Sequence, residues 1–365
     1  MVQNPTGLSR ELIIHPGETL AEVLSAKEMS QKELAARAGV SEKHVSTIIN
    51  GTKPISVSFA KKLEYVVGVD ASFWCNLQSI YDREILEFEE ANNISEEELY
   101  ILKPLKMIIA YLSAIGCIGA EVNDADKVLG LRKLLGIVNL TLIPQISYNA
   151  AYRAHQSSSA DLYVMFAWQR ICEILTDDIE VSEILDMDKL QESIPEIKLL
   201  MFKDSNSINC ELARIFSECG IAFKIVRHFT GAPVQGFIKR AEHGKMILCM
   251  TLRQSYADRF WFTLFHEIAH ILNGDVKQKF VDFSSVKSEI EECADEFSRN
   301  VLMNSKEYKT FIDDSDFGLE SIRKFAKSEN VMPYIVIGRL MKEEILDWGH
   351  YSGEMIRYKW VEEMS

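Results

Sequence analysis

The spacing of apolar residues along the chain changes at about Ser207. Before that position apolar residues recur every three or four positions over most of the chain, which is typical of amphipathic helices. Beyond it a further helix precedes three short runs of apolar and β-branched residues, which predict strands at 221–226, 234–240 and 245–253. Helical spacing then returns. The pattern therefore predicts a mainly α protein with one small β-sheet, an α+β fold.

Residues 17–81 carry the signals of five short helices. A capping box at 30–33 starts one helix, and Gly39 marks the tight turn that ends it. Ser41 is the expected N-cap of the next helix, which closes at the Asn-Gly pair 50–51. Two helices joined by so short a glycine turn predict a helix-turn-helix.

The second helix of this pair has one apolar and one polar face. Val45, Ile48 and Ile49 are expected to face the core. The outer side carries the donors and acceptors that suit base edges, and a lysine just beyond it is placed for a phosphate. The predicted DNA-binding residues are Lys43, His44, Ser46, Thr47, Asn50 and Lys53. Because the segment has no basic excess, the alternative is a helix pair that only packs against a protein partner.

The stretch RFWFTLFHEIAHILN, residues 259–273, contains an HExxH motif in an apolar setting. His266 and His270 are one helical turn apart, so both imidazoles project from one face and can bind one metal ion. Glu267 lies between them, where its carboxylate can take a proton from a water activated by the metal. The alternative is that these are two core histidines and a helix glutamate.

A catalytic zinc ion needs three protein ligands and one open position. Glu291 is the candidate for the third ligand, in a second helical stretch 21 residues beyond His270. Asp295 shares its helix face and is expected to accept the outward ring N–H of a ligand histidine. Two histidines and one carboxylate suit Zn²⁺ and also tolerate Mn²⁺. Alternatively this acidic run is a solvated helix face, which is the expectation for Glu289, Glu292 and Glu296.

The net charge of −14 is unevenly distributed over the 365 residues. Residues 15–70 contain seven Lys or Arg and seven Asp or Glu, whereas residues 71–365 contain 32 basic and 46 acidic side chains. The excess of acidic side chains therefore lies outside the predicted helix-turn-helix. Such a neutral segment can approach DNA phosphates without the acidity of the rest.

The seven cysteines are odd in number and lack CxxC spacing, which predicts reduced thiols in a cytoplasm. Cys293, close to the predicted site, is expected to have a packing role. The N-terminus lacks an apolar core of secretory length, and the longest lipid-like run, 107–120, is too short to span a bilayer. We therefore expect a cytoplasmic protein with no membrane partner.

The N-terminal region resembles the HigA family of antitoxins and repressors. The resemblance runs from the HPGETL motif to Tyr81-Asp82 and includes Phe73-Trp74 and Asn76-Leu77-Gln78. It implies operator binding as a homodimer and, in many members, pairing with a toxin.

The HExxH motif and the later E-x-x-A-D of residues 291–295 resemble the ImmA/IrrE family of metallopeptidases. This resemblance implies a gluzincin-like core and cleavage of a DNA-binding repressor. The chain departs from the family pattern at Asn304, where proline is frequent, and at Asn273-Gly274, where a further histidine is frequent.

Four parts are predicted: a helix-turn-helix domain at 1–90, a helical middle region at 91–205, a metallopeptidase core at 206–312 and a C-terminal helical extension at 313–365. The predicted function is that of a DNA-binding regulator whose zinc metallopeptidase cleaves a repressor or antitoxin. The alternative is a HigA-like repressor or antitoxin whose metal domain senses a signal or binds a partner without cutting.

Two details complete the expected peptidase site. The metallopeptidase resemblance implies an edge strand above the metal that pairs with an extended substrate, and Met246 to Thr251 is the candidate. The alternative is an ordinary edge strand with no ligand. The group that stabilises the oxyanion is left open among Tyr256, His228 and His350.

Overall fold

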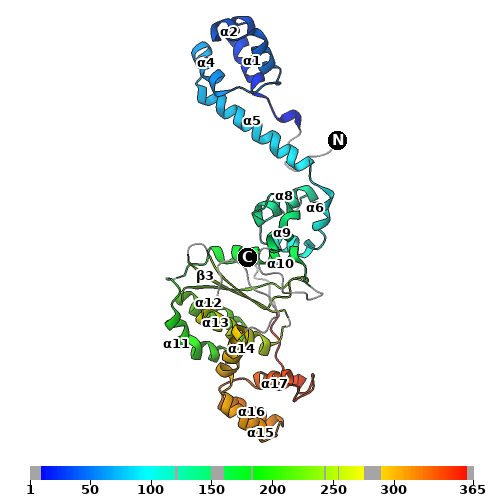
Figure 1. Ribbon diagram of the computed structural model, residues 1–365, viewed down its shortest axis with the longest axis vertical. Helices are drawn as coiled ribbons and strands as arrows, with labels where there is room; N and C mark the ends of the chain where they lie inside the picture. The colour runs from blue at the N-terminus through cyan, green and yellow to red at the C-terminus, as the bar shows by residue number, and fades with distance from the viewer. Residues whose placement is uncertain are drawn as a thin grey trace. The chain divides into compact units, whose positions relative to one another are not determined.

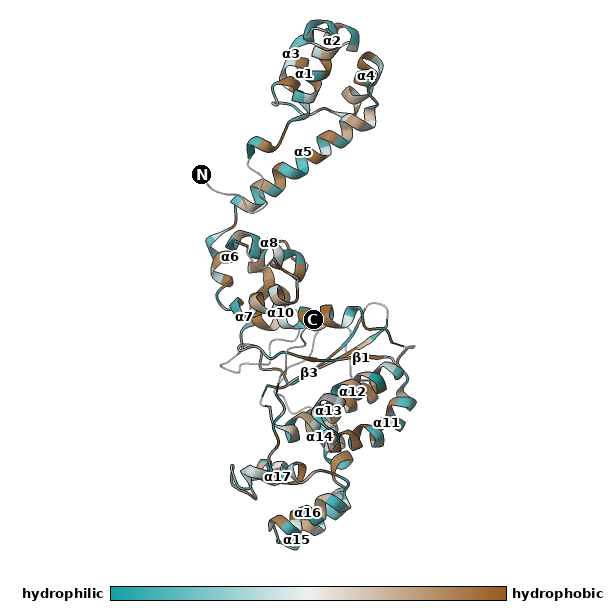
Figure 2. Cartoon of the chain, turned by 180° about the vertical axis from the view of Figure 1, so that it is seen from behind, coloured by the Kyte–Doolittle hydropathy of each residue, from teal (hydrophilic) through white to brown (hydrophobic). Residues whose placement is uncertain are grey.

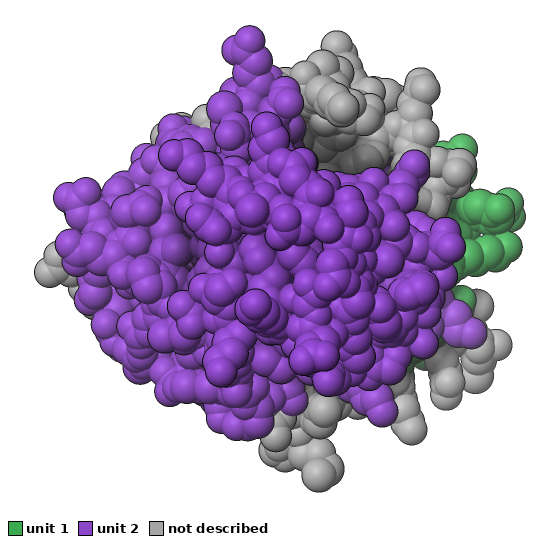
Figure 3. All heavy atoms as spheres, turned by 90° about the horizontal axis from the view of Figure 1, so that it is seen from below, with its two compact units in different colours: residues 1–103, 112–140 green, residues 104–111, 141–365 purple. Residues whose placement is uncertain are grey.

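A computed structural model describes residues 10–119, 122–148, 160–181, 184–241, 244–253, 255–274 and 289–359. The chain divides into two compact units (Figure 3). Unit 1 comprises residues 1–103 and 112–140, and unit 2 comprises residues 104–111 and 141–365. The sequence also predicts a turn at 241–244 between the second and third strands and a helix break at 157–159, and these lie partly and wholly outside the described residues.

Unit 1 begins with five helices around one apolar core (Figure 1). They are α1 (Pro16–Ala26), α2 (Gln31–Ala38), α3 (Glu42–Ile49), α4 (Val57–Val67) and α5 (Ala71–Asn92). The core includes Leu20, Leu34, Val45, Ile48 and Leu63, none of which exposes any surface.

The predicted N-caps of α2 and α3 and the glycine that ends α2 are confirmed, whereas the Glu33 side chain of the predicted capping box pairs with Arg37. The Ser30 hydroxyl accepts a hydrogen bond from the Glu33 N–H at 3.1 Å, and the Ser41 hydroxyl accepts one from the His44 N–H at 3.2 Å. Gly39 ends α2 in the left-handed region, with φ of 60°. These three local signals fix the short turn between the two helices.

The prediction of five short helices was wrong for the last one, because α5 continues for 22 residues to Asn92. No Pro or Gly occurs between Ala71 and Asn92, so nothing in that stretch stops the helix. Gln78 on α5 accepts a hydrogen bond from the Ile55 N–H at 2.9 Å, and Tyr81 packs edge-on against His15. The polar residues of the HigA resemblance therefore tie α5 to the segments before α1 and α4.

The close contact between α1 and α3 gives a stability prediction. A Cβ on Gly17 would lie 2.0 Å from the Ile48 carbonyl oxygen, so Gly17→Ala is expected to destabilise unit 1 by about 1–3 kcal/mol through overpacking. The measurement is hydrogen exchange of α1 and α3 amides by mass spectrometry. Gly353→Ala is the matched control, because its Cβ would meet no atom within 4 Å. Unchanged protection of α3 in Gly17→Ala would contradict the contact.

Helices α6 to α11 follow α5 in the described part of the chain. They are α6 (Glu96–Ile101), α7 (Lys106–Ala114), α8 (Asp124–Leu135), α9 (Ile143–Tyr148), α10 (Leu162–Asp177) and α11 (Met187–Leu199). In unit 1 the buried Glu98 carboxylate accepts hydrogen bonds from the Arg132 guanidinium and from the Leu140 N–H at 2.9 Å. This buried ion pair joins α6 to α8.

Unit 2 contains the predicted three-stranded sheet, in the order β1-β3-β2. β1 (Ile221–Val226) is parallel to β3 (Met246–Thr251), and β2 (Gly236–Arg240) is antiparallel to it. β3 is therefore the central strand, and the prediction that Met246–Thr251 forms an edge was wrong. β1 pairs with all six residues of β3 and β2 pairs with Met246 to Met250, so β1 and β2 are the two edges of the described sheet.

The sheet lies between helices. In Figures 1 and 2, α10 lies on one side of the strands, and α12 (Ser205–Glu218) and α13 (Ala257–Leu272) lie on the other. All six residues of β3 are buried, as expected for a strand covered on both faces. Trp168 on α10 is also buried, and its indole N–H donates to the Arg227 carbonyl at 3.2 Å.

Among the described residues four α-helices follow α13: α14 (Glu289–Leu302), α15 (Ser305–Asp313), α16 (Leu319–Ser328) and α17 (Pro333–Lys342). Asn304 caps α15, because its side-chain oxygen accepts from the Lys306 N–H at 2.9 Å.

Within the described residues no single helix is long and apolar enough to cross a membrane. One bent pair of helices, Asp124–Leu135 with Leu140–Ile146, meets that test by length and composition only.

Candidate metal centre and helix-turn-helix surface

Helix α13 is anchored by its apolar side chains and turns its two histidines to one side. Its buried residues include Trp261, Leu264 and Phe265, which pack into the core of unit 2. His266 and His270 are largely buried as well, with 19% and 13% of their side-chain surface exposed. Their Nε2 atoms face each other at 3.0 Å.

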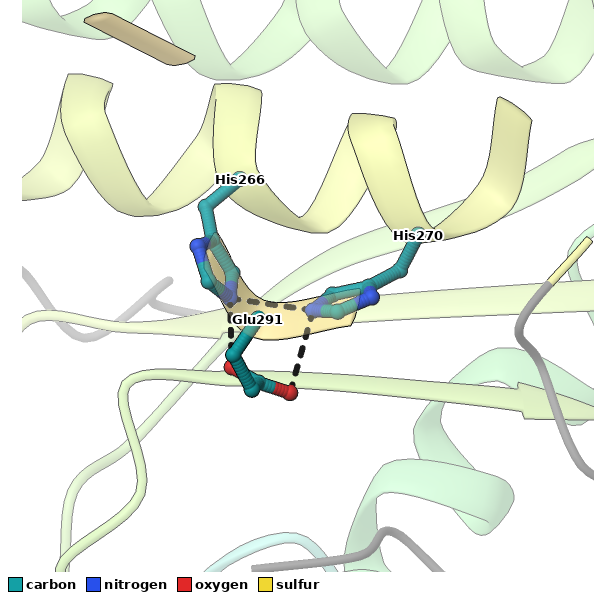
Figure 4. Close-up of side chains that lie close together, drawn as sticks. All are labelled: His266, His270 and Glu291. Atoms are coloured by element: carbon teal, nitrogen blue, oxygen red, sulfur yellow. Dashed lines mark hydrogen bonds and ion pairs between the residues drawn. The ribbon is translucent and has the colours of Figure 1, made fainter. Parts of the chain in front are cut away.

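Glu291 reaches the same point from α14, which packs along α13. Its two carboxylate oxygens lie 3.3 Å from His266 Nε2 and 3.5 Å from His270 Nε2 (Figure 4). One ligand atom from each of the three residues lies within 4.8 Å of the other two. The three side chains therefore converge on one point although Glu291 is 21 residues from His270.

The donor set fits a zinc ion held for catalysis. Two imidazole nitrogens and one carboxylate oxygen are ligands that Zn²⁺ takes in catalytic sites, where three protein ligands leave one position open. The two Nε2 atoms at 3.0 Å form a hydrogen bond only if one of them carries a proton, and when neither does both are acceptors. A divalent cation between them would satisfy both acceptors.

Asp295 lies on the outward side of His266, with its Oδ1 2.9 Å from Nδ1. Burial lowers the pKa of the His266 imidazole, but the bonds to Asp295 and Glu291 outweigh it and raise the pKa to about 10. In turn, the hydrogen bond that each carboxyl group makes to His266 lowers the pKa of Glu291 and the pKa of Asp295. In the metal-free protein the two carboxylates thus hold a proton on His266.

The Glu267 carboxylate packs against Gly236, the first residue of β2. A Cβ on Gly236 would lie 2.2 Å from Glu267 Oε1, so the glycine leaves the room that this carboxylate fills. Burial raises the pKa of Glu267 to about 7. Beside it the Thr263 hydroxyl donates to the Gln235 side-chain oxygen at 3.1 Å. Sequence reasoning missed Gly236 and Gln235, although a glycine in a predicted strand indicates a close approach.

The three candidates for oxyanion stabilisation lie in different surroundings. The Tyr256 hydroxyl accepts a hydrogen bond from Arg357, and His350 packs edge-on against Tyr351. His228 Nδ1 is buried and has no hydrogen-bond partner among the described residues.

Cys293 is exposed, so the expectation that it packs was wrong. The acidic residues expected to be solvated are exposed: Glu289, Glu292 and Glu296.

The outer side of α3 presents the predicted polar residues unevenly. Lys43, Asn50 and Lys53 are exposed, whereas His44 packs edge-on against Phe59, with ring centroids 5.1 Å apart. The Thr47 hydroxyl donates to the His44 carbonyl at 2.9 Å, within the helix. Ser46 is partly buried and accepts from the Asn50 amide at 3.4 Å. Val45 and Ile48 are buried, as predicted, and Ile49 is partly buried.

The helix-turn-helix family matches residues 20–74, which cover α2 and α3. The chain belongs to this family through that region. A relative is Virulence-associated protein I of Dichelobacter nodosus, 33% identical over 84 residues that cover 23% of this chain and 78% of the relative.

Two solved structures are also similar over short segments. The antitoxin HigA of Pseudomonas aeruginosa, solved with the higBA promoter, is 32% identical over 23% of this chain and 96% of its own, with a TM-score of 0.21. An addiction module antidote protein of a HigA family from Coxiella burnetii is 38% identical over 20% of this chain and 79% of its own, with a TM-score of 0.19. Scores this low establish no shared fold for the chain.

Proposed function

We propose that this protein is a DNA-binding regulator whose second unit is a zinc-dependent metalloendopeptidase that cleaves a repressor or antitoxin protein. The observation that carries the proposal is the convergence of His266, His270 and Glu291, with the Glu267 carboxylate next to them. A domain that only binds metal has no chemical need for Glu267. A peptidase needs a base at that place.

In the proposed reaction each residue has one task. His266, His270 and Glu291 hold the zinc ion, which lowers the pKa of water and polarises a carbonyl group. Glu267 accepts the proton of the attacking water and delivers it to the leaving amine. Asp295 keeps the His266 ring in the tautomer that directs Nε2 inward, because it accepts from Nδ1.

The free edge of β2 is proposed to bind the substrate backbone. β2 pairs with β3 on one side, and its first residue touches Glu267. An extended peptide that adds to this edge by backbone hydrogen bonds would bring its scissile bond beside that carboxylate.

The helix-turn-helix is proposed to bind operator DNA as a homodimer, with a toxin as a further partner. Support comes from the matched family and from the relatives, one solved with a promoter and another named an antidote protein. The exposed Lys43, Asn50 and Lys53 are the side chains proposed to contact DNA first.

The function is tested by co-incubating the zinc-loaded full chain with the repressor or antitoxin encoded beside it. Defined fragments that disappear with a chelator and return with zinc are expected. If Glu267→Gln keeps metal and DNA binding and leaves regulation unchanged, the proteolytic function is refuted. The alternative function then remains. In it the protein is a HigA-like repressor or antitoxin, and its metal unit senses a signal or binds a partner without proteolysis.

Gly236→Ala gives a second check on the substrate edge. The added methyl group would displace the Glu267 carboxylate or push β2 away, so peptide hydrolysis is expected to fall by about 100-fold, the effect of misplacing a catalytic group by about 1 Å. Zinc affinity should stay unchanged, because Gly236 contacts none of the three ligands proposed. Peptide cleavage and zinc titration are measured on the same samples, and wild-type rates in Gly236→Ala would contradict the close contact.

Zinc binding is expected to release about one proton at pH 7–8. The pKa of His266 is raised to about 10 in the metal-free protein, so the ring is charged there, and it must lose its proton to bind metal. Apparent zinc affinity should therefore rise about tenfold per pH unit until pH approaches that value. Calorimetry in two buffers of different ionisation enthalpy measures the release. Asp295→Asn should lower the number of protons released. If zinc binding to the wild type released no proton, His266 could not be a charged ring that loses its proton to the metal site.

A further inference from the structure

Three arginines gather around Tyr256, at the start of α13. Arg357 donates to the Tyr256 hydroxyl and lies over its ring at 4.3 Å from the centroid, and Arg259 lies 5.8 Å from the same centroid. Arg253 lines the same pocket as Arg259 and Tyr256 and donates to the Pro233 carbonyl at 2.9 Å. The segment at 355–358 is held there by a hydrogen bond from the Tyr358 N–H to the Ser255 carbonyl at 2.7 Å.

None of the three guanidinium groups has a carboxylate within 4.0 Å among the described residues. Other arginines of unit 2 do pair with a carboxylate: Arg170, Arg214, Arg299, Arg323 and Arg339. Like charges gathered without an ion-paired carboxylate among the described residues, in a chain of net charge −14, form a place where an external anion is favoured. Guanidinium groups bind carboxylates with two parallel hydrogen bonds.

The pocket adjoins the proposed catalytic carboxylate. Its lining includes Gln235 and Thr263, which are hydrogen-bonded to each other. Thr263 lies one helical turn before Glu267, and Gln235 directly precedes Gly236. A peptide extended along the β2 edge advances about 3.3 Å per residue, so it reaches the pocket within a few residues of Glu267.

We propose that Arg253, Arg259 and Arg357 form a subsite that binds an aspartate or glutamate side chain of the substrate, close to the scissile bond. This inference rests on the proposed peptidase function. It adds a specificity: the protein cuts polypeptides with an acidic residue at one fixed position from the cleavage site.

The first test uses the zinc-loaded full chain and an unbiased peptide library. Wild type is expected to enrich Asp and Glu at one position by at least about 10-fold, the size of one charge-assisted contact. Arg253→Glu, an exposed position, should abolish the enrichment. Lys309→Glu makes the same charge change on an exposed face of α15 and should keep it. The proposed subsite is refuted if the wild type cleaves peptides without a preference for acidic residues. It is also refuted if Arg253→Glu keeps that preference.

The second test separates the subsite from the proposed activity. Labelled peptides of one length, with a central Glu, Gln or Lys, are titrated against full-length Glu267→Gln protein and followed by fluorescence anisotropy. The Glu peptide is expected to bind at least about 10-fold tighter than the Gln peptide, and Arg253→Glu or Arg259→Gln should remove that difference. Equal binding of the three peptides overturns the subsite. Selective binding with no cleavage by wild type upholds it and refutes the peptidase function.

Discussion

Replacing Glu267 with glutamine is expected to lower the rate of peptide hydrolysis by about 100- to 10,000-fold, the range that a positioned general base contributes. Glutamine has nearly the same size as glutamate and keeps one acceptor oxygen, but its amide cannot accept a proton from water. The rate is measured with the zinc-loaded full chain and a peptide cut by wild type.

Zinc content distinguishes this effect from loss of the site. Glu267→Gln should retain one zinc ion per chain, because the three proposed ligands are unchanged. Glu296→Gln, on the exposed face of α14, is the matched control and should keep the wild-type rate. A Glu267→Gln variant as active as wild type would mean that the water is deprotonated by another group.

His270→Ala is expected to reduce zinc affinity by more than about 100-fold, because even groups that only orient a ligand contribute 10- to 100-fold. The removed nitrogen lies 3.0 Å from His266 Nε2 and 3.5 Å from a Glu291 oxygen, so no described side chain replaces it within the set of three. Affinity is measured by competition with a chromophoric chelator.

Two comparison variants make the affinity result specific. Asp295→Asn should weaken zinc binding by only about 10- to 100-fold, because it orients His266 without being in the proposed ligand set. His228 lies outside both α13 and α14, so His228→Ala should leave the zinc affinity unchanged. Equal zinc affinity in His270→Ala and wild type would exclude His270 as a ligand.

The features that the sequence predicted well depend on local spacing. His266 and His270 share a helix face because they are four residues apart, and the turn at Gly39 follows from caps within one turn of it. The three strands were predicted from their composition. Each of these signals lies within a stretch shorter than about a dozen residues.

The features that the sequence did not predict depend on distant partners. β3 was expected at an edge because of the metallopeptidase resemblance, but β1 and β2 both pair with it. Strand order is set by contacts that no short pattern encodes. Arg357 meets Tyr256 across 101 residues. The close approach of Gly236 to Glu267 likewise exists only once β2 packs on α13.

X-ray absorption spectroscopy at the zinc edge, on full-length protein loaded with one equivalent of zinc, tests the metal centre most directly. We predict two imidazole nitrogens at about 2.0–2.1 Å and carboxylate or water oxygens at about 2.0–2.2 Å, with no sulfur neighbour. The imidazole contribution should fall by half in His270→Ala. A sulfur shell, or a spectrum of hydrated zinc that is the same in both proteins, would contradict a site built from His266, His270 and Glu291.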